Sequence, residues 1–490
     1  MSQADATTER PSDLPNPKST ASFWHSEPSP LLLGHRSTRE LPNHADVVVV
    51  GSGITGASVA HHLLRHHDED GKKENEKLNV VMLEAREACW GATGRNGGHC
   101  QPLLYDVPTD PSIGHFELRN FASIQSLIAS KSIDCEFYPQ PGVRALMTSA
   151  DLADADKSLA TLQKSDASLA ARVKLVTDKD ELKRLKLGPK AKGAIVTDIA
   201  ARMWPYKFVA RILEDLLTSP SIAGRFNLQT HTPVTAIKPT GDASQPWSIQ
   251  TERGTMTARN VVLATNAYTS HLVPSFADVI VPCRGQMSAL KPPPTASGES
   301  RLQTSFGFVG HSQDDYLIQR PNERGGHLMF GGGRPNGHAL GVTDDSVIDD
   351  RTATYLRRSL FGLLDLGDGE ETKAEEKLEL EAVNEWTGIM GFSRDNVPWV
   401  GPVPSQPGMF MSAGYTGHGM PNTWLCGAAA AAMVVAMEEG ADEKAAVQAG
   451  IQEVGLPKCY ILNDARLERV RKMETVRKQD ERMMFKAEAT

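Results

Sequence analysis

The stretch DVVVVGSGITG, residues 46–56, decides the fold of this chain. Its four consecutive valines, Val47 to Val50, are typical of a strand that is buried on both faces. A glycine turn follows directly, and apolar residues then recur at helical spacing through residues 57–64. The stretch therefore predicts a strand, a tight turn and a helix.

The three glycines of the turn have the spacing G-x-G-x-x-G of a dinucleotide-binding fingerprint. Gly51 is expected to allow the tight turn, Gly53 to let the backbone approach a pyrophosphate, and Gly56 to let the helix pack against the strand. The pyrophosphate would lie at the helix N-terminus, beside the intervening Ser52, Ile54 and Thr55. An ordinary glycine turn without a ligand is the alternative interpretation.

An acidic residue ends the second predicted strand, residues 79–83, as the fingerprint requires. The Glu84 carboxylate would accept hydrogen bonds from the adenosine ribose and repel a 2′-phosphate, which argues against NADP. Glu84 follows Gly56 by 28 residues, against about 20 in the usual motif. The charged insertion at residues 68–77 accounts for the difference. Ala85 and Arg86 follow the acid and are expected to border the same ligand.

A long glycine-rich loop, GATGRNGG at residues 91–98, comes soon after the acid. Backbone that approaches a large planar ligand would explain such a loop. We therefore predict ligand contacts from Gly91, Ala92, Thr93, Asn96, Gly97 and Gly98.

These motifs together resemble the D-amino acid oxidase-like family of FAD-dependent oxidoreductases, and within it the γ-glutamylputrescine oxidase-like branch. The resemblance covers about residues 23 to 440. Four later stretches carry it further: Ala264-Thr265-Asn266-Ala267-Tyr268, Pro282-Cys283-Arg284-Gly285-Gln286, Trp386-Thr387-Gly388 and Gly414-Tyr415-Thr416-Gly417-His418-Gly419.

The resemblance implies an FAD cofactor and adds residues to its site. The implied contacts are Val234 at the adenine half, Ala264, Thr265 and Gly388, and the turn residues Gly414, Thr416, Gly417, His418 and Gly419 at the flavin ring. A helix after this turn would direct its positive end at the ring. Covalent attachment through Cys89, Cys100 or His99 is the alternative to noncovalent FAD, but these residues do not occupy the family's attachment positions.

The resemblance also implies oxidation of a carbon–nitrogen bond by hydride transfer to the flavin, usually with O2 as acceptor. His418 and His99 are candidates to take the substrate proton, or are structural. Tyr316 could line the pocket or pack beneath the sheet.

An arginine that binds the carboxylate of α-amino acids in the family is missing at Trp386-Thr387-Gly388. A small amine or γ-glutamyl amine is therefore the better substrate. Arg284, Arg320 and Arg394 could contact a carboxylate from elsewhere, or be exposed.

The expected fold class is α/β, with a Rossmann-like FAD-binding domain around a central parallel sheet, interleaved with an α+β substrate domain on a mostly antiparallel sheet. An irregular, proline-rich arm is expected on the surface and a solvated charged helix at the C-terminal end. The predicted division is 1–44 arm, 45–105, 196–270 and 381–440 FAD-binding domain, 106–195 and 271–380 substrate domain, and 441–490 tail.

Composition excludes several classes of protein. Hydrophobic residues make up 40% of the chain and charged residues 23%, as in globular proteins, and the net charge of −8 gives no footprint for nucleic acid. The apolar window 424–437 is too short to span a bilayer and predicts a buried helix. Six scattered cysteines predict no metal site and fit a reducing, cytoplasmic setting.

Two other functions stay open on the sequence alone. The first is an NAD-linked dehydrogenase built on the same fingerprint, and the second is a catalytically idle FAD-binding protein. The oligomeric state is not predicted.

Overall fold

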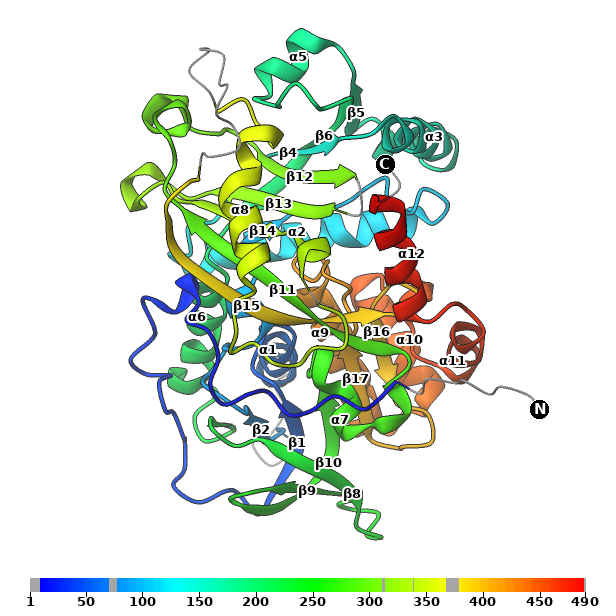
Figure 1. The fold of residues 1–490 in the computed structure, drawn as a ribbon. Coiled ribbons are helices and arrows are strands. Elements are labelled where there is room, and N and C mark those ends of the chain that lie inside the picture. Colours follow the sequence, from blue (N-terminus) through cyan, green and yellow to red (C-terminus); the bar gives the residue numbers. More distant parts are fainter. Residues whose placement is uncertain (1–8, 70–76, 311–312, 338, 367–378, 489–490) are drawn as a thin grey trace, which may run out of the picture.

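The structure is a computed structural model that describes residues 9–69, 77–310, 313–337, 339–366 and 379–488. Two sheets form its frame, one above the other in Figure 1. The charged insertion that we predicted at 68–77 lies for the most part outside the described residues.

The first sheet has eight strands in the described residues, and its centre is parallel. Its main path is β16 (Trp399–Pro402), β17 (Met409–Ala413), β10 (Gly254–Leu263), β1 (His44–Val50), β2 (Val80–Leu83) and β7 (Phe226–Gln229), and β8 (Val234–Pro239) and β9 (Trp247–Thr251) join β10 as an antiparallel ribbon. The predicted strand, turn, helix and second strand are confirmed as β1, α1 (Ile54–Glu69) and β2.

The second sheet has nine strands in the described residues, and all of its pairs except β12 with β4 are antiparallel. Its order is β15 (Ala382–Ser393), β11 (Ile280–Leu290), β14 (Leu328–Gly332), β13 (Gln313–Gln319), β12 (Ser305–Gly310), β4 (Tyr138–Leu146), β6 (Gly193–Arg202) and β3 (His99–Cys100), with β5 (Val173–Val176) on β6. The expected fold class, a parallel-rich sheet with a mostly antiparallel partner, is confirmed.

Helices pack against both sheets. They are α2 (Pro111–Lys131), α3 (Ser149–Ser165), α4 (Ala167–Ala170), α5 (Lys179–Arg184), α6 (Pro205–Thr218), α7 (Thr269–Leu272), α8 (Asp350–Leu363), α9 (Thr423–Glu438), α10 (Glu443–Val454), α11 (Asp464–Arg471) and α12 (Val476–Glu488). The predicted domain boundary at 195/196 falls inside β6, and β15 continues the second sheet past residue 381. The division into domains stays a prediction.

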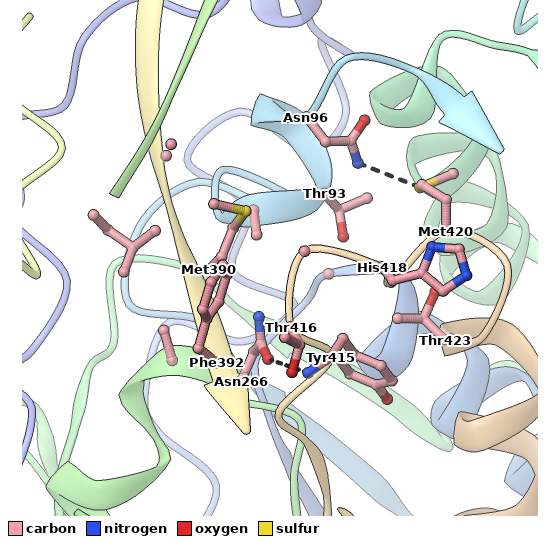
Figure 2. Close-up of a pocket in the computed structure, with 18 of the residues that line it drawn as sticks. Thr93, Asn96, Asn266, Met390, Phe392, Tyr415, Thr416, His418, Met420 and Thr423 are labelled. Atoms are coloured by element: carbon pink, nitrogen blue, oxygen red, sulfur yellow. Dashed lines mark hydrogen bonds between the residues drawn. The ribbon is translucent and has the colours of Figure 1, made fainter. Parts of the chain in front are cut away.

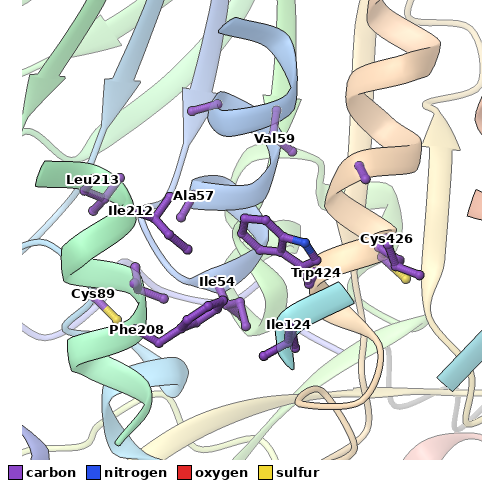
Figure 3. Packing of buried hydrophobic residues seen from close by; sticks show 14 of the residues in the cluster. Ile54, Ala57, Val59, Cys89, Ile124, Phe208, Ile212, Leu213, Trp424 and Cys426 are labelled. Carbon is purple, nitrogen blue, oxygen red and sulfur yellow. The ribbon is translucent and has the colours of Figure 1, made fainter. Parts of the chain in front are cut away.

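The largest core cluster lies where α9 packs on α1, with α6 and α2 nearby. Trp424 of α9 is buried there among Ile54, Phe208 and Ile124 (Figure 3). The helix α9 carries apolar residues on all of its faces, as helices in the core of a large protein do. The predicted buried helix at 424–437 is confirmed, and no helix of the described residues is both long and apolar enough to cross a membrane.

The N-terminal arm is irregular, as predicted, but the expectation that it lies on the surface is wrong for its inner part. Trp24 and Leu32 are almost completely buried and belong to the main core cluster. Proline prevents regular structure here, but it does not prevent burial of a large apolar side chain, which gains about 2–3 kcal/mol.

The tail is helical, as predicted, but it is not a purely solvated helix. Leu467 and Val470 of α11 are buried in the second core cluster. The Arg466 guanidinium lies over the Trp399 ring at 3.6 Å and pairs with Asp395. The alternating charged residues of the tail made these few buried contacts impossible to recognise from the sequence.

Candidate active site

One cavity of about 780 Å³ connects the two sheets. Met390 and Phe392 of β15 lie on one side of it, and His418 and Thr423 lie on the other, with Thr93 between them (Figure 2). Most of the residues predicted for the cofactor line this cavity: Gly51, Ser52, Gly53, Ile54, Thr55, Glu84, Ala85, Arg86, Gly91, Ala92, Thr93, Asn96, Gly97, Val234, Ala264, Thr265, Gly388, Thr416, Gly417, His418 and Gly419.

Two of the fingerprint glycines, Gly51 and Gly56, stand where side chains would not fit. Gly51 has a φ of +104°, and a Cβ there would lie 2.7 Å from the Ala264 carbonyl oxygen. A Cβ on Gly56 would lie 1.9 Å from the Gly51 carbonyl oxygen, so Gly56 serves the packing of helix on strand and is not among the residues lining the cavity. The first intrahelical bond runs from Ala57 N–H to the Gly53 carbonyl, so the N–H groups before Ala57 have no partner within the helix. Ser52 N and Ile54 N donate to Glu84 and Thr93 instead, and Gly53 and Thr55 lie at the cavity end of α1.

The Glu84 carboxylate is held by the same turn. Its Oε2 accepts hydrogen bonds from Ser52 N at 3.0 Å and Ser52 Oγ at 2.6 Å, and its Oε1 accepts from Arg86 N at 2.9 Å. A carboxylate has about four acceptor positions, so lone pairs remain for hydroxyl groups of a ligand.

The loop of residues 91–98 links the two sheets. Gly97 N donates to the Tyr316 hydroxyl of β13 at 3.0 Å, and a Cβ on Gly97 would lie 2.2 Å from Tyr316 Cε2. Thr93 Oγ1 accepts from Ile54 N at 3.1 Å, which places the loop over the start of α1. Gly98 is covered by the chain and does not line the cavity. Tyr316 does line it, so both sequence interpretations of this residue hold in part.

The second glycine turn, residues 414–419, faces the first loop across the cavity. Asn266 Oδ1 accepts from Gly414 N at 3.0 Å, and Thr416 N donates to the Gly391 carbonyl at 2.8 Å. The following helix, α9, begins only at Thr423, so its N-terminus reaches the cavity through Thr423 itself and not through the glycines. Gly414 lies behind the lining residues.

His418 does not have the neutral imidazole that we expected of a proton acceptor. Its Nε2 lies 2.8 Å from Oε1 of the buried Glu117 on α2. Burial alone would lower the pKa of His418, but the charge of the Glu117 carboxylate and its hydrogen bond raise that pKa above its usual value. The pair therefore favours a cationic imidazolium at this wall.

His99 is the opposite case. Burial and, to a smaller extent, the charge of His418 together lower the pKa of His99 to about 3. Its Nε2 lies 2.9 Å from Ser305 Oγ, and its ring stacks near Tyr316. His99 is uncharged at neutral pH, and a group of such low basicity is a poor acceptor for an ammonium proton.

The three arginines that we considered for a substrate carboxylate do not line the cavity. Arg284 lies over a separate small cleft, where its Nη1 donates to the Asp344 carbonyl at 3.4 Å. Arg320 is buried against Glu136, and Arg394 pairs with Asp278.

Charged residues that no sequence motif marks lie at the end of the cavity that faces the second sheet. Arg144 of β4 and Arg334 after β14 line it, together with Asp106, Asp314 and Asp480. Asp480 belongs to α12, in the tail, and no motif marks it. Only Gly331-Gly332-Gly333 before Arg334 gave a local signal, as a turn.

The described residues contain no group of three or more histidine, cysteine or acidic side chains placed to hold a metal ion. All six cysteines are free thiols, and none is among the residues lining the cavity.

A parallel sheet with a fingerprint turn, an acid at the next strand and a second sheet closing the cavity define a dinucleotide-dependent oxidoreductase. The family model "DAO: FAD dependent oxidoreductase" matches residues 46–433, and the chain belongs to this family. It is an FAD-dependent oxidoreductase acting on amines or amino acids, so an NAD-linked dehydrogenase is set aside.

Several characterised relatives resemble the chain over most of its length. It is 25% identical over 401 residues to γ-glutamylputrescine oxidoreductase of Escherichia coli, covering 78% of this chain and 82% of the relative. It is also 25% identical over 384 residues to glycine oxidase of Pseudomonas putida, covering 76% and 90%. The solved glycine oxidase of Geobacillus kaustophilus superposes with a TM-score of 0.63 at 19% identity, covering 82% and 96%, and supports the fold.

The residues present fit FAD. Gly51 makes the turn that brings the start of α1 to the cavity, where the N–H groups of Gly53 and Thr55 lie beside the space for a pyrophosphate, and Glu84 keeps acceptor capacity for ribose hydroxyls. The rest of the cavity, between residues 91–98 and 414–419, is broad and largely apolar near Met390 and Phe392, as a planar ring requires.

Proposed function

We propose that this flavoenzyme oxidises the carbon–nitrogen bond of a small amine or γ-glutamyl amine, and not that of a simple α-amino acid. One observation carries the proposal. Each of the four arginines that line the cavity in the described residues already pairs with a carboxylate of the protein.

At the dinucleotide end, Arg86 and Arg95 share the buried Asp345, at 2.9 Å and 3.5 Å. At the other end, Arg144 pairs with Asp106 at 2.9 Å. Arg334 pairs with Asp480 at 2.5 Å and with Asp314 at 3.3 Å. A substrate α-carboxylate would have to displace one of these partners to obtain a bidentate arginine contact. The displacement is costly for the buried pairs of Arg86 and Arg95 with Asp345, and less costly for Arg144, whose partner Asp106 is half-exposed.

The wall that replaces the family's arginine supports the same conclusion. Trp386 and Thr387 are buried and directed into the chain, and the next residues of β15, Ile389 and Met390, present apolar side chains to the cavity. An apolar wall tolerates the methylene chain of an alkylamine and offers nothing to a carboxylate. The printed names of the relatives do not decide between the substrates, because an amine oxidoreductase and a glycine oxidase are equally identical.

Bound FAD would supply the hydride acceptor, and we propose dioxygen as the final electron acceptor. The chain itself orients the amine and excludes water. The imidazolium of His418, held by Glu117, would stabilise negative charge on the cavity side of residues 414–419. Neither His418 nor His99 is suited to take the substrate proton, so the amine would enter already deprotonated.

We propose that FAD is held without a covalent bond, because none of the six cysteines is among the residues that line the cavity. Free cysteines throughout also fit a cytoplasmic protein.

The test is anaerobic reduction of the yellow purified protein by a substrate panel. Putrescine, γ-glutamylputrescine and N-acetylputrescine are compared with glycine and D-alanine by loss of flavin absorbance at about 450 nm. Bleaching by the amines at concentrations at which the amino acids do nothing supports the proposal. Faster bleaching by the amino acids would refute the substrate class, and no bleaching at all would favour an idle FAD-binding protein. Admitting air and measuring hydrogen peroxide then tests dioxygen.

A further inference from the structure

The inner part of the N-terminal arm, residues 19–29, lies outside the matched family range of 46–433 and is nevertheless built into the molecule. Ser22 is 3% exposed and Trp24 is fully buried. A segment without regular structure is seldom buried unless its polar groups have hydrogen-bond partners. The hydrogen bonds of the arm therefore identify the part of the protein to which it is attached.

Those bonds converge on the loop of residues 91–98. Ser22 Oγ donates to the Gly94 carbonyl at 2.8 Å, and Trp24 Nε1 donates to the Asn96 carbonyl at 2.5 Å. The intervening Arg95 donates to the Thr20 carbonyl at 2.6 Å and to Thr20 Oγ1 at 3.1 Å. Three consecutive loop residues are thus bonded to the arm.

Two strands of the second sheet also hold the loop. Trp386 Nε1 of β15 donates to the Arg95 carbonyl at 2.7 Å, and Gly97 is bonded to Tyr316 of β13. The arm supplies the remaining side, where the His25 ring stacks on Trp90 at 3.7 Å between centroids.

The arm is fixed in turn to the body of the protein. Trp204 Nε1 donates to the Trp24 carbonyl at 2.7 Å, and Ser29 N donates to the Tyr206 hydroxyl at 3.0 Å. The Arg320 guanidinium lies 4.6 Å from the Phe23 ring centroid. The arm therefore connects the loop to α6 and to the second sheet.

We propose that residues 19–29 are a positioning element for FAD, which keeps the loop of residues 91–98 in its binding conformation and so retains the cofactor. A loop with glycines at 91, 94, 97 and 98 has many conformations when free, and ordering it only on binding would reduce affinity. The arm removes that cost in advance. The proposal depends on the placement of FAD against this loop, but not on the identity of the substrate.

Trp24→Phe is the decisive variant, because it removes the indole N–H and keeps a buried ring. Trp247→Phe is the matched control: Trp247 is also buried, its Nε1 donates to the Pro407 carbonyl at 3.0 Å, and it lies in the other core cluster, away from the cavity. Ser22→Ala is a second arm variant in case Trp24→Phe does not fold, and Asn96→Ala reports on the loop itself.

The measurement is the Kd of FAD for each deflavinated protein by flavin fluorescence, with the melting temperature of the FAD-free form as the test of folding. We expect Trp24→Phe and Ser22→Ala to raise Kd about 5-fold or more, because each leaves a buried loop carbonyl without its donor, and Trp247→Phe to leave Kd within about twofold. If Asn96→Ala weakens FAD binding and both arm variants do not, the positioning role is refuted. If Asn96→Ala also leaves the Kd of FAD unchanged, the placement of FAD against this loop is wrong, and the positioning role of the arm is refuted with it. An equal loss in Trp247→Phe would likewise overturn the proposal.

Discussion

His418 and Glu117 are 301 residues apart in the chain, yet His418 Nε2 lies 2.8 Å from Glu117 Oε1 at the wall of the cavity. Glu117 is held in place by Leu103 N at 2.7 Å and by Asn422 Nδ2 at 3.1 Å. Because its carboxylate opposes the effect of burial, it determines the charge of the imidazole.

Glu117→Gln should lower the pH at which His418 loses its proton. In the native protein the pKa of His418 is raised above its usual value. The pair with Glu117 therefore stabilises the folded protein fully below about pH 6.5, the usual histidine pKa. This stabilisation is lost as the pH rises through the pKa of His418 in the folded protein. Without the carboxylate, burial dominates, although Asp106 still favours the cation and Arg144 opposes it. A pH titration of the flavin absorbance of the holoenzyme should show the transition at lower pH.

Glu87→Gln is the control for that titration, because Glu87 pairs with the half-exposed His231 at 2.7 Å and does not line the cavity. The transition should not move in this variant. An unchanged midpoint in Glu117→Gln would show that Glu117 does not control His418.

Gly97→Ala should destabilise the protein, because the new Cβ would lie 2.2 Å from Tyr316 Cε2. Overpacking of this kind costs about 1–3 kcal/mol. Gly91→Ala in the same loop meets nothing within 4 Å and should leave the melting temperature of the FAD-free protein unchanged. Equal melting temperatures for the two variants would mean that the loop does not pack against β13.

Asp480→Ala should weaken substrate binding more than turnover. Asp480 brings a carboxylate of α12 to the cavity and holds Arg334, and its loss leaves Arg334 with Asp314. We expect KM for a diamine, whose distal amine stays cationic, to rise about 3- to 10-fold with kcat within about twofold, because the distal charge is remote from the reacting bond. Glu443→Ala, an exposed acid at the start of α10, is the control with the same change of charge. A fall in kcat at constant KM would contradict a binding role.

Asp315→Asn should stabilise the protein increasingly as pH rises. Burial raises the pKa of Asp315 to about 7, although its bonds to Tyr355 and Gly333 oppose the shift. The folded value is above the unfolded one, so the contribution of Asp315 to stability is complete below about pH 4 and is lost as pH rises through about 7. Urea unfolding at pH 5 and pH 8 should show a gain in Asp315→Asn that is larger at pH 8 by roughly 1–3 kcal/mol.

The exposed Asp198, which pairs with Arg172 at 3.0 Å, provides the comparison. Asp198→Asn should change stability equally at both pH values. If Asp315→Asn behaves the same way, Asp315 does not titrate in this range in the folded protein.

Much of the fold could be predicted because its signals are local. Val47 to Val50 and the glycines that follow specify a buried strand and a sharp turn within about ten residues, and each glycine has a steric reason that can be stated in advance. The glycine-rich loop of residues 91–98 and the apolar helix that contains Trp424 are also marked by local sequence. The sequence by itself thus determined the dinucleotide site and the two kinds of sheet.

Only the tertiary structure decided the contacts between distant segments. Nothing near Trp24 indicates that its indole will hold Asn96, and nothing near Asp480 indicates that it will reach Arg334. Helical and strand periodicity reports which face of an element is apolar, but a charge or a hydrogen-bond donor carries no local mark of its partner. The charge of His418, the engaged arginines and the buried arm follow from long-range packing, which is why they were found only in three dimensions.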